Sequence, residues 1–258
     1  MKVKDIIAVI EDFAPLSNQE SWDNSGLCIG SPEDEVHGVM LALDCTEELV
    51  DEAVKAGADM IVTHHPLIFG GISKILKEDP VGATIIKAIS AGVAIYASHT
   101  ASDKVPDGVS GAMAARLGLV NLRILNEDRP GSGLGMIGEL PTPISADEAV
   151  KLVKNAFNLK SLRSSRPVDK PIRTIAVCGG SGASLINDAR EQGADLYVSG
   201  DISYHRFFLP EGFMVMDIGH YESERDIVDI LFSLLTKKFP NFAVRISENI
   251  NSNPIFYF

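Results

Sequence analysis

Hydrophobic residues in the first hundred positions follow two alternating patterns. From Val3 to Ile10 they recur at helical spacing, and Pro15 lies just beyond, so the chain is expected to begin with an amphipathic helix. Short apolar runs then alternate with amphipathic segments, which predicts strands at 39–43, 59–65 and 93–99 and helices at 46–57 and 80–92. Strands that alternate with helices are typical of a parallel sheet covered by helices.

The second half of the sequence repeats this alternation after a connecting region, 127–171, which carries a glycine-rich stretch at 131–138. Within that region, Ser145 and Glu148 have the spacing of a capping box and predict the start of a helix. The pattern further predicts strands at 172–177, 195–200 and 213–219, a loop and helix at 179–193, and a long amphipathic helix at 223–239.

Two motifs occur once in each half, which indicates an internal duplication. Gly-Ala-Asp at 57–59 returns at 193–195, an offset of 136, and His99-x-x-x-Asp103 is matched by His220-x-x-x-Glu224, an offset of 121. The predicted fold is therefore α/β, with two related and interlinked halves, 1–126 and 127–258. Ligands of open α/β sheets bind at the carboxyl ends of the strands, so a metal site is expected in a cleft between the halves.

Composition excludes several classes of protein. The 258 residues are 45% hydrophobic and 22% charged, which is globular, and the net charge of −12 disfavours nucleic acid and anionic lipid as partners. The three cysteines are far apart, which argues for a reducing compartment and against a thiolate metal site. No signal peptide or long apolar run is recognisable, so a cytoplasmic protein without a membrane partner is expected.

Histidines are concentrated at the carboxyl ends of the predicted parallel strands. His64 and His65 close one strand before Pro66, and His99 and His220 close two others. Because Pro66 breaks the strand, both imidazoles of the pair can turn towards one cleft, where each can bind a different metal ion. The alternative is that one histidine of the pair lies at the surface and the other is a hydrogen-bonded core residue.

Each of two histidines precedes a carboxylate by four residues, as His99 does Asp103 and His220 does Glu224. Glu224 is expected near the start of the last helix, where the helix dipole favours an ionised carboxylate that can bridge two cations. Alternatively, His220 and Glu224 form a solvated loop pair. The donor set is then His64, His65, Asp103, His220 and Glu224. Nitrogen and oxygen donors without sulfur suit Zn, Fe, Mn or Ni, and five ligands leave positions for water.

A glycine-rich turn between a strand and a helix, Gly179-Gly180-Ser181-Gly182, resembles an anion-binding nest and is the candidate substrate-binding segment. It lacks the full phosphate-loop and dinucleotide fingerprints, and a tight strand-to-helix turn explains it equally well. The single tryptophan, Trp22, lies in a polar segment and either lines the cleft or caps the core.

Six motifs in fixed order give the chain a resemblance to the Nif-three-like dinuclear metal centre family, also called GTP cyclohydrolase 1 type 2 homologues. They are Trp22-Asp23-Asn24-Ser25-Gly26-Leu27, Thr63-His64-His65-Pro66, Ser98-His99-Thr100-x-x-Asp103, Gly179-Gly180-Ser181-Gly182, Gly200-Asp201-x-x-x-His205 and Gly219-His220-x-x-Ser223-Glu224.

The resemblance implies two divalent metal ions per subunit and a toroidal homohexamer, a trimer of dimers. By the family pattern, His64 and Asp103 would bind one ion, His65 and His220 the other, and Glu224 would bridge them. One departure is Ala101, where the family commonly has Asn.

Three functions are compatible with these features. The first is a metal-dependent hydrolase acting on a small anionic molecule, plausibly a nucleotide, because two metal ions activate water and stabilise an oxyanion. His99 and His205, which the ligand set does not need, are then the candidate general acid or base. The alternatives are a metal-binding regulatory or metal-handling protein without turnover, and a scaffold whose ring binds another protein.

Overall fold

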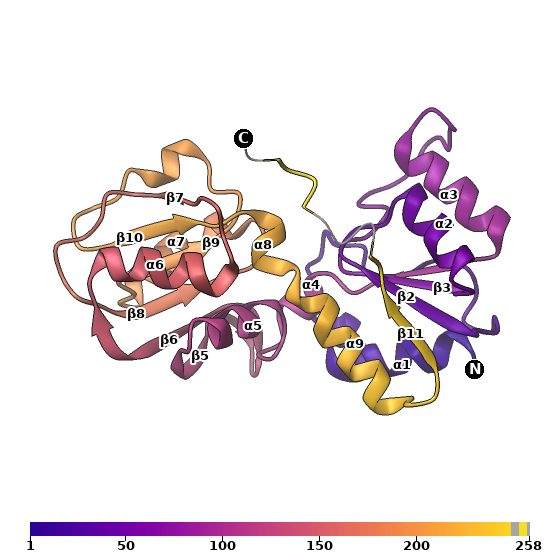
Figure 1. Ribbon diagram of the computed structural model, residues 1–258, viewed down its shortest axis with the longest axis horizontal. Coiled ribbons are helices and arrows are strands. Elements are labelled where there is room, and N and C mark those ends of the chain that lie inside the picture. Colours follow the sequence, from indigo (N-terminus) through magenta and orange to yellow (C-terminus); the bar gives the residue numbers. More distant parts are fainter. Residues whose placement is uncertain (249–252, 257–258) are drawn as a thin grey trace. The chain divides into compact units, whose positions relative to one another are not determined.

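The computed structural model describes residues 1–248 and 253–256 of the chain, and the α/β fold is as predicted. The chain forms two compact units (Figure 1). Unit 1 comprises Met1–Ser102 and Ile227–Phe258, and unit 2 comprises Asp103–Asp226. The chain therefore passes from unit 1 into unit 2 and then returns. Among the residues described, no helix combines the length and the apolar character needed to cross a membrane.

Unit 1 contains a five-stranded sheet in the order β1-β4-β3-β2-β11. Strands β11, β2, β3 and β4 run parallel, and β1 runs antiparallel to β4 at the edge. The elements are α1 (Val3–Phe13), η1 (Leu16–Asn18), β1 (Gly26–Ile29), β2 (Gly38–Ala42), α2 (Glu47–Lys55), β3 (Met60–Thr63), α3 (Pro80–Ala91), β4 (Ala94–Ala97), α4 (Thr100–Asp103), α9 (Asp226–Lys238) and β11 (Ala243–Ile246).

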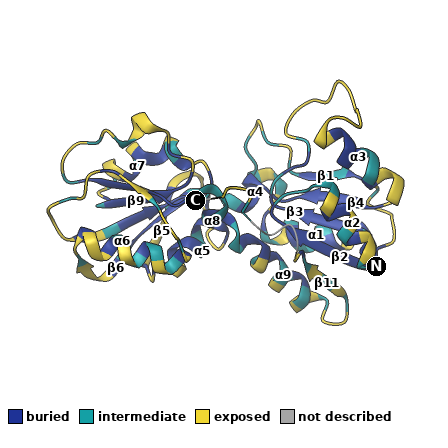
Figure 2. Cartoon of the chain, turned by 45° about the horizontal axis from the view of Figure 1, so that its top comes forward, coloured by how far each residue is buried: buried dark blue, intermediate teal, exposed yellow. Residues whose placement is uncertain are grey.

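Helices cover both faces of this sheet, as the continuous apolar strands require. Leu49 of α2 and Ile85 of α3 pack against Ile61 of β3 in one cluster of buried residues. On the other face, the Tyr96 hydroxyl of β4 donates to Glu11 Oε1 of α1 at 3.3 Å. Figure 2 shows the central strands β2, β3 and β4 as buried and parts of the helices as exposed.

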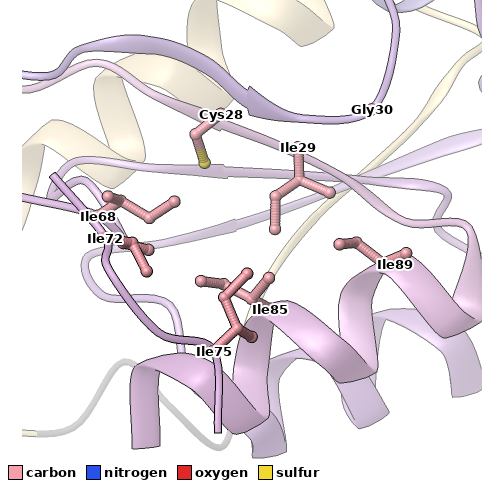
Figure 3. Close-up of a pocket in the computed structure, with 8 residues that line it drawn as sticks. All are labelled: Cys28, Ile29, Gly30, Ile68, Ile72, Ile75, Ile85 and Ile89. Carbon is pink, nitrogen blue, oxygen red and sulfur yellow. The ribbon is translucent and has the colours of Figure 1, made fainter.

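An apolar cavity of about 500 Å³ lies beside α3 and β1 in unit 1 (Figure 3). Its lining is almost entirely aliphatic and consists of Cys28, Ile29, Gly30, Ile68, Ile72, Ile75, Ile85 and Ile89. Burial raises the pKa of the Cys28 thiol to about 11, so the one reactive group in the lining is protonated at neutral pH. The cavity therefore offers no charge for chemistry, and the polar strand ends remain the candidate site.

Unit 2 contains a six-stranded sheet in the order β5-β6-β8-β9-β10-β7, of which β8, β9 and β10 run parallel. The elements are α5 (Val109–Arg116), β5 (Val120–Arg129), β6 (Ser132–Ile144), α6 (Ala146–Phe157), β7 (Arg163–Ser164), β8 (Ile172–Val177), η2 (Gly182–Leu185), α7 (Ile186–Glu191), β9 (Leu196–Ser199), η3 (Tyr204–Phe207), β10 (Met214–Asp217) and α8 (His220–Glu224).

The alternation of side chains along β9 separates the two cores of unit 2. Leu196 and Val198 pack with helices α5 and α6, whereas Tyr197 packs with α7 on the other face. Helix α6 begins as predicted, because Ser145 and Glu148 form the reciprocal capping box.

The repeated Gly-Ala-Asp segment has the same role in both units. Gly57 and Gly193 both adopt positive φ, of 71° and 82°, where the preceding helix ends. The backbone N–H of Asp59 donates to a carbonyl of β2, and its own carbonyl accepts from the first residue of β4. Asp195 is bonded in the same way to β8 and β10. The structure thus repeats one helix-to-strand turn, as the first motif predicted.

The second predicted match is shifted by one residue. In unit 1, Met60 pairs with Ala94, and in unit 2 the equivalent Leu196 pairs with Met214. Ala94 and Met214 are 120 residues apart, not the 121 that aligned His99 with His220. By strand register His99 corresponds to Gly219, so the His-x-x-x-carboxylate motifs are not equivalent.

The compact units also differ from the predicted halves, 1–126 and 127–258. A division at residue 126 would cut β5, which pairs with β6 in a long hairpin built from the glycine-rich stretch that was interpreted as a connection. The C-terminal segment leaves the second half, because β11 pairs in parallel with β2 of unit 1. Main-chain pairing therefore determines both boundaries, within a hairpin for β5 and β6 and between segments distant in sequence for β11 and β2.

Candidate metal centre

Three imidazoles lie together at strand ends in unit 1. His64 and His65 follow β3 directly, and His99 follows β4 by two residues, so the sheet brings them to one edge. Their ligand atoms lie within 4.8 Å of one another, which is close enough to hold a metal ion. His64 is fully buried and the side chain of His65 is only 12% exposed. The alternative of a surface histidine in this pair therefore does not apply.

Each of these imidazoles is held through its Nδ1 atom. The His64 Nδ1 lies 2.9 Å from the Ser98 carbonyl oxygen, and His65 Nδ1 lies 2.8 Å from Asp44 Oδ1. A carbonyl oxygen only accepts, so His64 Nδ1 carries the hydrogen and Nε2 carries the lone pair. Histidines that bind metals are held in this way, with an oxygen acceptor fixing the ring and its tautomer.

His99 Nδ1 lies 2.8 Å from Asp23 Oδ1, so this imidazole is again held through Nδ1. Burial alone would raise the pKa of Asp23, but hydrogen bonds from His99, Thr100 and Ser25 outweigh it and hold the pKa well below its usual range. Asp23 is therefore ionised at neutral pH. An ionised carboxylate only accepts hydrogen bonds, so Asp23 accepts the hydrogen on Nδ1 and orients the ring.

His220 and Glu224 are the first and last residues of α8, one turn apart in unit 2. His220 Nε2 lies 2.9 Å from Glu224 Oε2, and His220 Nδ1 lies 2.7 Å from Asp201 Oδ2. Burial would raise the pKa of Asp201, but hydrogen bonds from His220 and Ser181 lower it overall. The solvated loop pair is thus excluded, because Glu224 is buried and His220 is held on both sides.

Glu224 occupies a different place in its helix from the one predicted. The expected long helix at 223–239 is divided into α8 and α9, and Glu224 ends α8 instead of beginning α9. The favourable dipole argument therefore fails for this carboxylate. Ser223 does not cap α9 either, because its hydroxyl donates to the His220 carbonyl and accepts from Gly180 N.

A carboxylate oxygen of Glu224 lies within 4.8 Å of a ligand atom of Asp103, which is also in unit 2. Glu224 thus lies close to both Asp103 and His220. Asp103 is the last residue of α4 and the first residue of unit 2. Within unit 2, Glu224 is the carboxylate common to both contacts.

The predicted anion nest at Gly179-Gly180-Ser181-Gly182 has its glycine amides engaged within the protein. Gly179 N donates to Ser110 Oγ, Gly180 N to Ser223 Oγ, and Gly182 N to Ser199 Oγ. These amides do not face outward, as binding of a phosphate would require. The turn instead accommodates the candidate ligands, because a Cβ on Gly180 would come within 3.0 Å of Glu224 Oε1.

His205, predicted as a general acid or base, lies on η3 in unit 2 and is exposed. Its ring packs against Tyr204 and Phe208 at centroid distances of 5.2 and 6.4 Å. In residues 1–248 and 253–256, His205 is in none of the groups whose ligand atoms are spaced for a metal. His99 is in such a group, so only one of the two predicted proton-transfer histidines lies beside the other imidazoles.

Acidic residues that hold the imidazoles were missed as functional residues. Asp44 follows β2 by two residues and Asp201 follows β9 by two, so both had the same signal as the histidines, a polar side chain just after an apolar strand. Asp23 carried no such signal, because its loop precedes the edge strand β1. Its contact with His99 depends on the pairing of β1 with β4.

The cysteines agree with a donor set of nitrogen and oxygen. Cys178 is buried, and burial raises the pKa of its thiol to about 12, as it does for Cys45. Protonated thiols are poor metal ligands at neutral pH.

These features define a two-unit α/β protein in which imidazoles and carboxylates collect at the carboxyl ends of parallel strands. The chain belongs to the Duf34/NIF3 (NGG1p interacting factor 3) family, whose model matches residues 1–254. The predicted family is thereby confirmed.

Relatives with known sequences or structures are similar over nearly the whole chain. A "GTP cyclohydrolase 1 type 2 homolog" of Clostridium acetobutylicum is 37% identical, with 96% of each chain covered. Among solved structures, a hypothetical protein of Staphylococcus aureus has a TM-score of 0.90 at 31% identity and covers 100% of this chain and 99% of its own. "Reduced HcgD" of Methanocaldococcus jannaschii has a TM-score of 0.81 at 29% identity, with 96% and 98% covered.

Proposed function

We propose that this protein is a metal-dependent hydrolase with a dinuclear centre, acting on a small anionic substrate such as a nucleotide. The observation that carries the proposal is the arrangement of the histidines. His64, His65 and His220 each have Nδ1 beside an oxygen acceptor, so Nε2 is the proposed metal ligand. In His220 this atom lies 2.9 Å from Glu224 Oε2, another proposed ligand. The name "GTP cyclohydrolase 1 type 2 homolog" of the relatives supports a nucleotide as substrate.

In this proposal, His64 and Asp103 would hold one ion, His65 and His220 would hold the other, and Glu224 would be a ligand shared by both. The proximity of Glu224 to both Asp103 and His220 within unit 2 supports its bridging role. The donors suit Zn, Fe, Mn or Ni. Bound divalent ions would supply a Lewis acid and a nucleophilic water at neutral pH.

His99 is the residue that transfers a proton in the proposed reaction. The ionised Asp23 holds its Nδ1, so that Nε2 is the atom that takes up or releases the proton. Asp23 keeps the ring oriented and stabilises the imidazolium that forms. The matching role first assigned to His205 is not retained, because its exposed ring packs with aromatic side chains instead of the imidazoles.

The experiment that tests this function is metal analysis of purified protein followed by an activity screen. Protein loaded with the metal found would be assayed against nucleotides and simple phosphoesters, beside the Glu224→Ala and His99→Gln variants. We expect turnover that Glu224→Ala abolishes and that His99→Gln lowers by about 100-fold or more. Tight metal binding without turnover on any of these compounds would favour the alternative, a metal-handling or regulatory protein.

We also propose a homohexamer, a trimer of dimers, on the strength of the family resemblance. Each subunit would keep its own metal centre.

A further inference from the structure

Two large aromatic side chains in unit 1 are exposed and also contact the ring of His99. Trp22 is 61% exposed and Phe69 is 56% exposed. Their rings meet the ring of His99 edge to face, at centroid distances of 5.9 Å and 5.6 Å. Single exposed apolar residues are ordinary on protein surfaces. Two that converge on one buried imidazole beside a candidate metal centre call for a specific explanation.

The segments that carry these aromatic residues are tied to each other and to the sheet. Asp23, directly after Trp22, accepts hydrogen bonds from His99 Nδ1 and from the amide and hydroxyl of Thr100. Asn24 Nδ2 donates to the carbonyl of Ile68 at 2.7 Å, directly before Phe69. The two segments are thus tied together before any ligand binds, which lowers the entropic cost of ordering them on binding.

We propose that Trp22 and Phe69 form a stacking subsite for a planar heteroaromatic ring of purine type, next to His99. The inference rests on the proposed function and names the part of the substrate that lies away from the reacting bond. Exposed aromatic faces attract nucleobases by stacking, with a contribution large enough to matter for a small ligand. Stacking also needs no positive charge, which suits a chain with a net charge of −12.

The second exposed aromatic group, Tyr204 and Phe208 around His205 in unit 2, is a natural comparison. Phe208 is 71% exposed, and these rings also contact an imidazole. In the described part of the chain, His205 belongs to none of the groups whose ligand atoms are spaced for a metal, whereas His99 belongs to one. Phe208→Leu therefore makes the same chemical change as Phe69→Leu at a site where we expect no base to bind.

Trp22 is the only tryptophan of the chain, so its fluorescence reports on this subsite alone. Full-length protein loaded with Zn²⁺ would be titrated with guanosine and adenosine, which carry no phosphate, and with ribose 5-phosphate, which carries no base. We expect saturable quenching by both nucleosides and none by ribose 5-phosphate. Phe69→Leu should weaken nucleoside binding by about five-fold or more, and Phe208→Leu should not change it.

The Trp22→Leu variant has lost the fluorophore, so its affinity for guanosine is measured by equilibrium dialysis with labelled guanosine. We expect this affinity to fall by at least as much as in Phe69→Leu. Nucleoside affinity that is undetectable, or that Phe208→Leu lowers as much as Phe69→Leu does, overturns the subsite. The Glu224→Ala variant separates this result from the fate of the hydrolase. If that variant still binds nucleosides when it has lost metal and turnover, the subsite stands by itself. If the protein shows metal-dependent turnover of base-free phosphoesters but does not bind nucleosides, the proposed hydrolase activity is supported and the proposed stacking subsite is wrong.

Discussion

At the scale of single residues, the acidic residues behind the imidazoles decide how well the site can hold a metal. Asp44 lies 2.8 Å from His65 Nδ1 and Asp201 lies 2.7 Å from His220 Nδ1. A third pair with the same geometry, His37 and Asp59 at 2.7 Å, lies away from the candidate ligands and offers an internal control.

Asp44→Asn and Asp201→Asn should each lower metal affinity by about 10–100-fold, because the amide cannot hold the imidazole as a carboxylate does. Competition with a chromophoric chelator at fixed pH measures the affinity. Asp59→Asn should leave it unchanged. Equal losses in all three variants would show that the effect arises from general instability and not from the orientation of the ligands.

At the scale of elements, the turn from β8 to η2 determines where the Glu224 carboxylate can lie. Gly180 has a φ of 61° and has no room for a side chain beside Glu224 Oε1. Gly193 also has a positive φ, of 82°, but a Cβ there would meet nothing within 4 Å.

Gly180→Ala and Gly193→Ala should each lower the free energy of unfolding by roughly 1–2 kcal/mol, because both force alanine into the left-handed region. Only Gly180→Ala should also lower metal affinity, since its Cβ displaces a ligand. Urea unfolding and metal titration, made on both variants, separate the two effects. Metal affinity that is unaffected in Gly180→Ala would contradict the placement of Glu224 against this turn.

Elements with a regular hydrophobic pattern were predictable, and elements without one were not. Helices α1, α2, α3 and α6 and the parallel strands β2, β3, β4, β8, β9 and β10 were predicted from spacing and capping alone. The parallel strand β11 was not predicted, because it joins the sheet by pairing with the distant β2. The β5–β6 hairpin was missed because its glycines suggested a loop. In the structure, three of the four glycines lie in β6, and Gly133 packs so closely on the backbone of Asn126 that no side chain would fit.

The candidate ligands were predictable because each follows a predicted strand closely, but their relation to one another was not. The motif match that made Asp103 and Glu224 equivalent is shifted by one residue against the strand register, and Asp103 belongs to unit 2. Glu224 was placed at a helix start because the break between α8 and α9, at Arg225, left no mark in the hydrophobic pattern.

At the scale of the whole molecule, acid should release the metal. The hydrogen-bonded Asp201 has a lowered pKa, so this acceptor stays ionised from pH 8 to 5. Metal must compete with protons for the imidazoles, whose ordinary pKa is about 6.5, so affinity should fall as the pH drops through that range. Dialysis of loaded protein at stepped pH, with elemental analysis, measures the loss. Full retention at pH 5 would mean that histidines are not the main ligands.

The proposed assembly has its own test. Light scattering after size-exclusion chromatography should give six times the mass of one chain, and it should do so for Glu224→Ala as well if the metals only serve the site. A monomer at micromolar concentration would contradict the proposed hexamer but would not bear on the proposed metal centre.

The central claim is a pair of metal ions joined by Glu224, and metal content per chain tests it most directly. Wild-type protein and the variants Asp103→Ala, Glu224→Ala and Glu222→Ala would be loaded at equal free metal and measured side by side. Glu222 lies two residues before Glu224 on the same helix, outside the proposed ligands, and is the control.

We expect about two ions per chain in the wild type and in Glu222→Ala. Asp103→Ala should keep about one, because it removes a ligand of one ion only. Glu224→Ala should lose most of both, because without the shared anion two cations repel at short range. A wild-type content that never exceeds one ion would contradict the paired centre, and an Asp103→Ala variant that loses both ions while Glu224→Ala keeps one would transfer the bridge to Asp103.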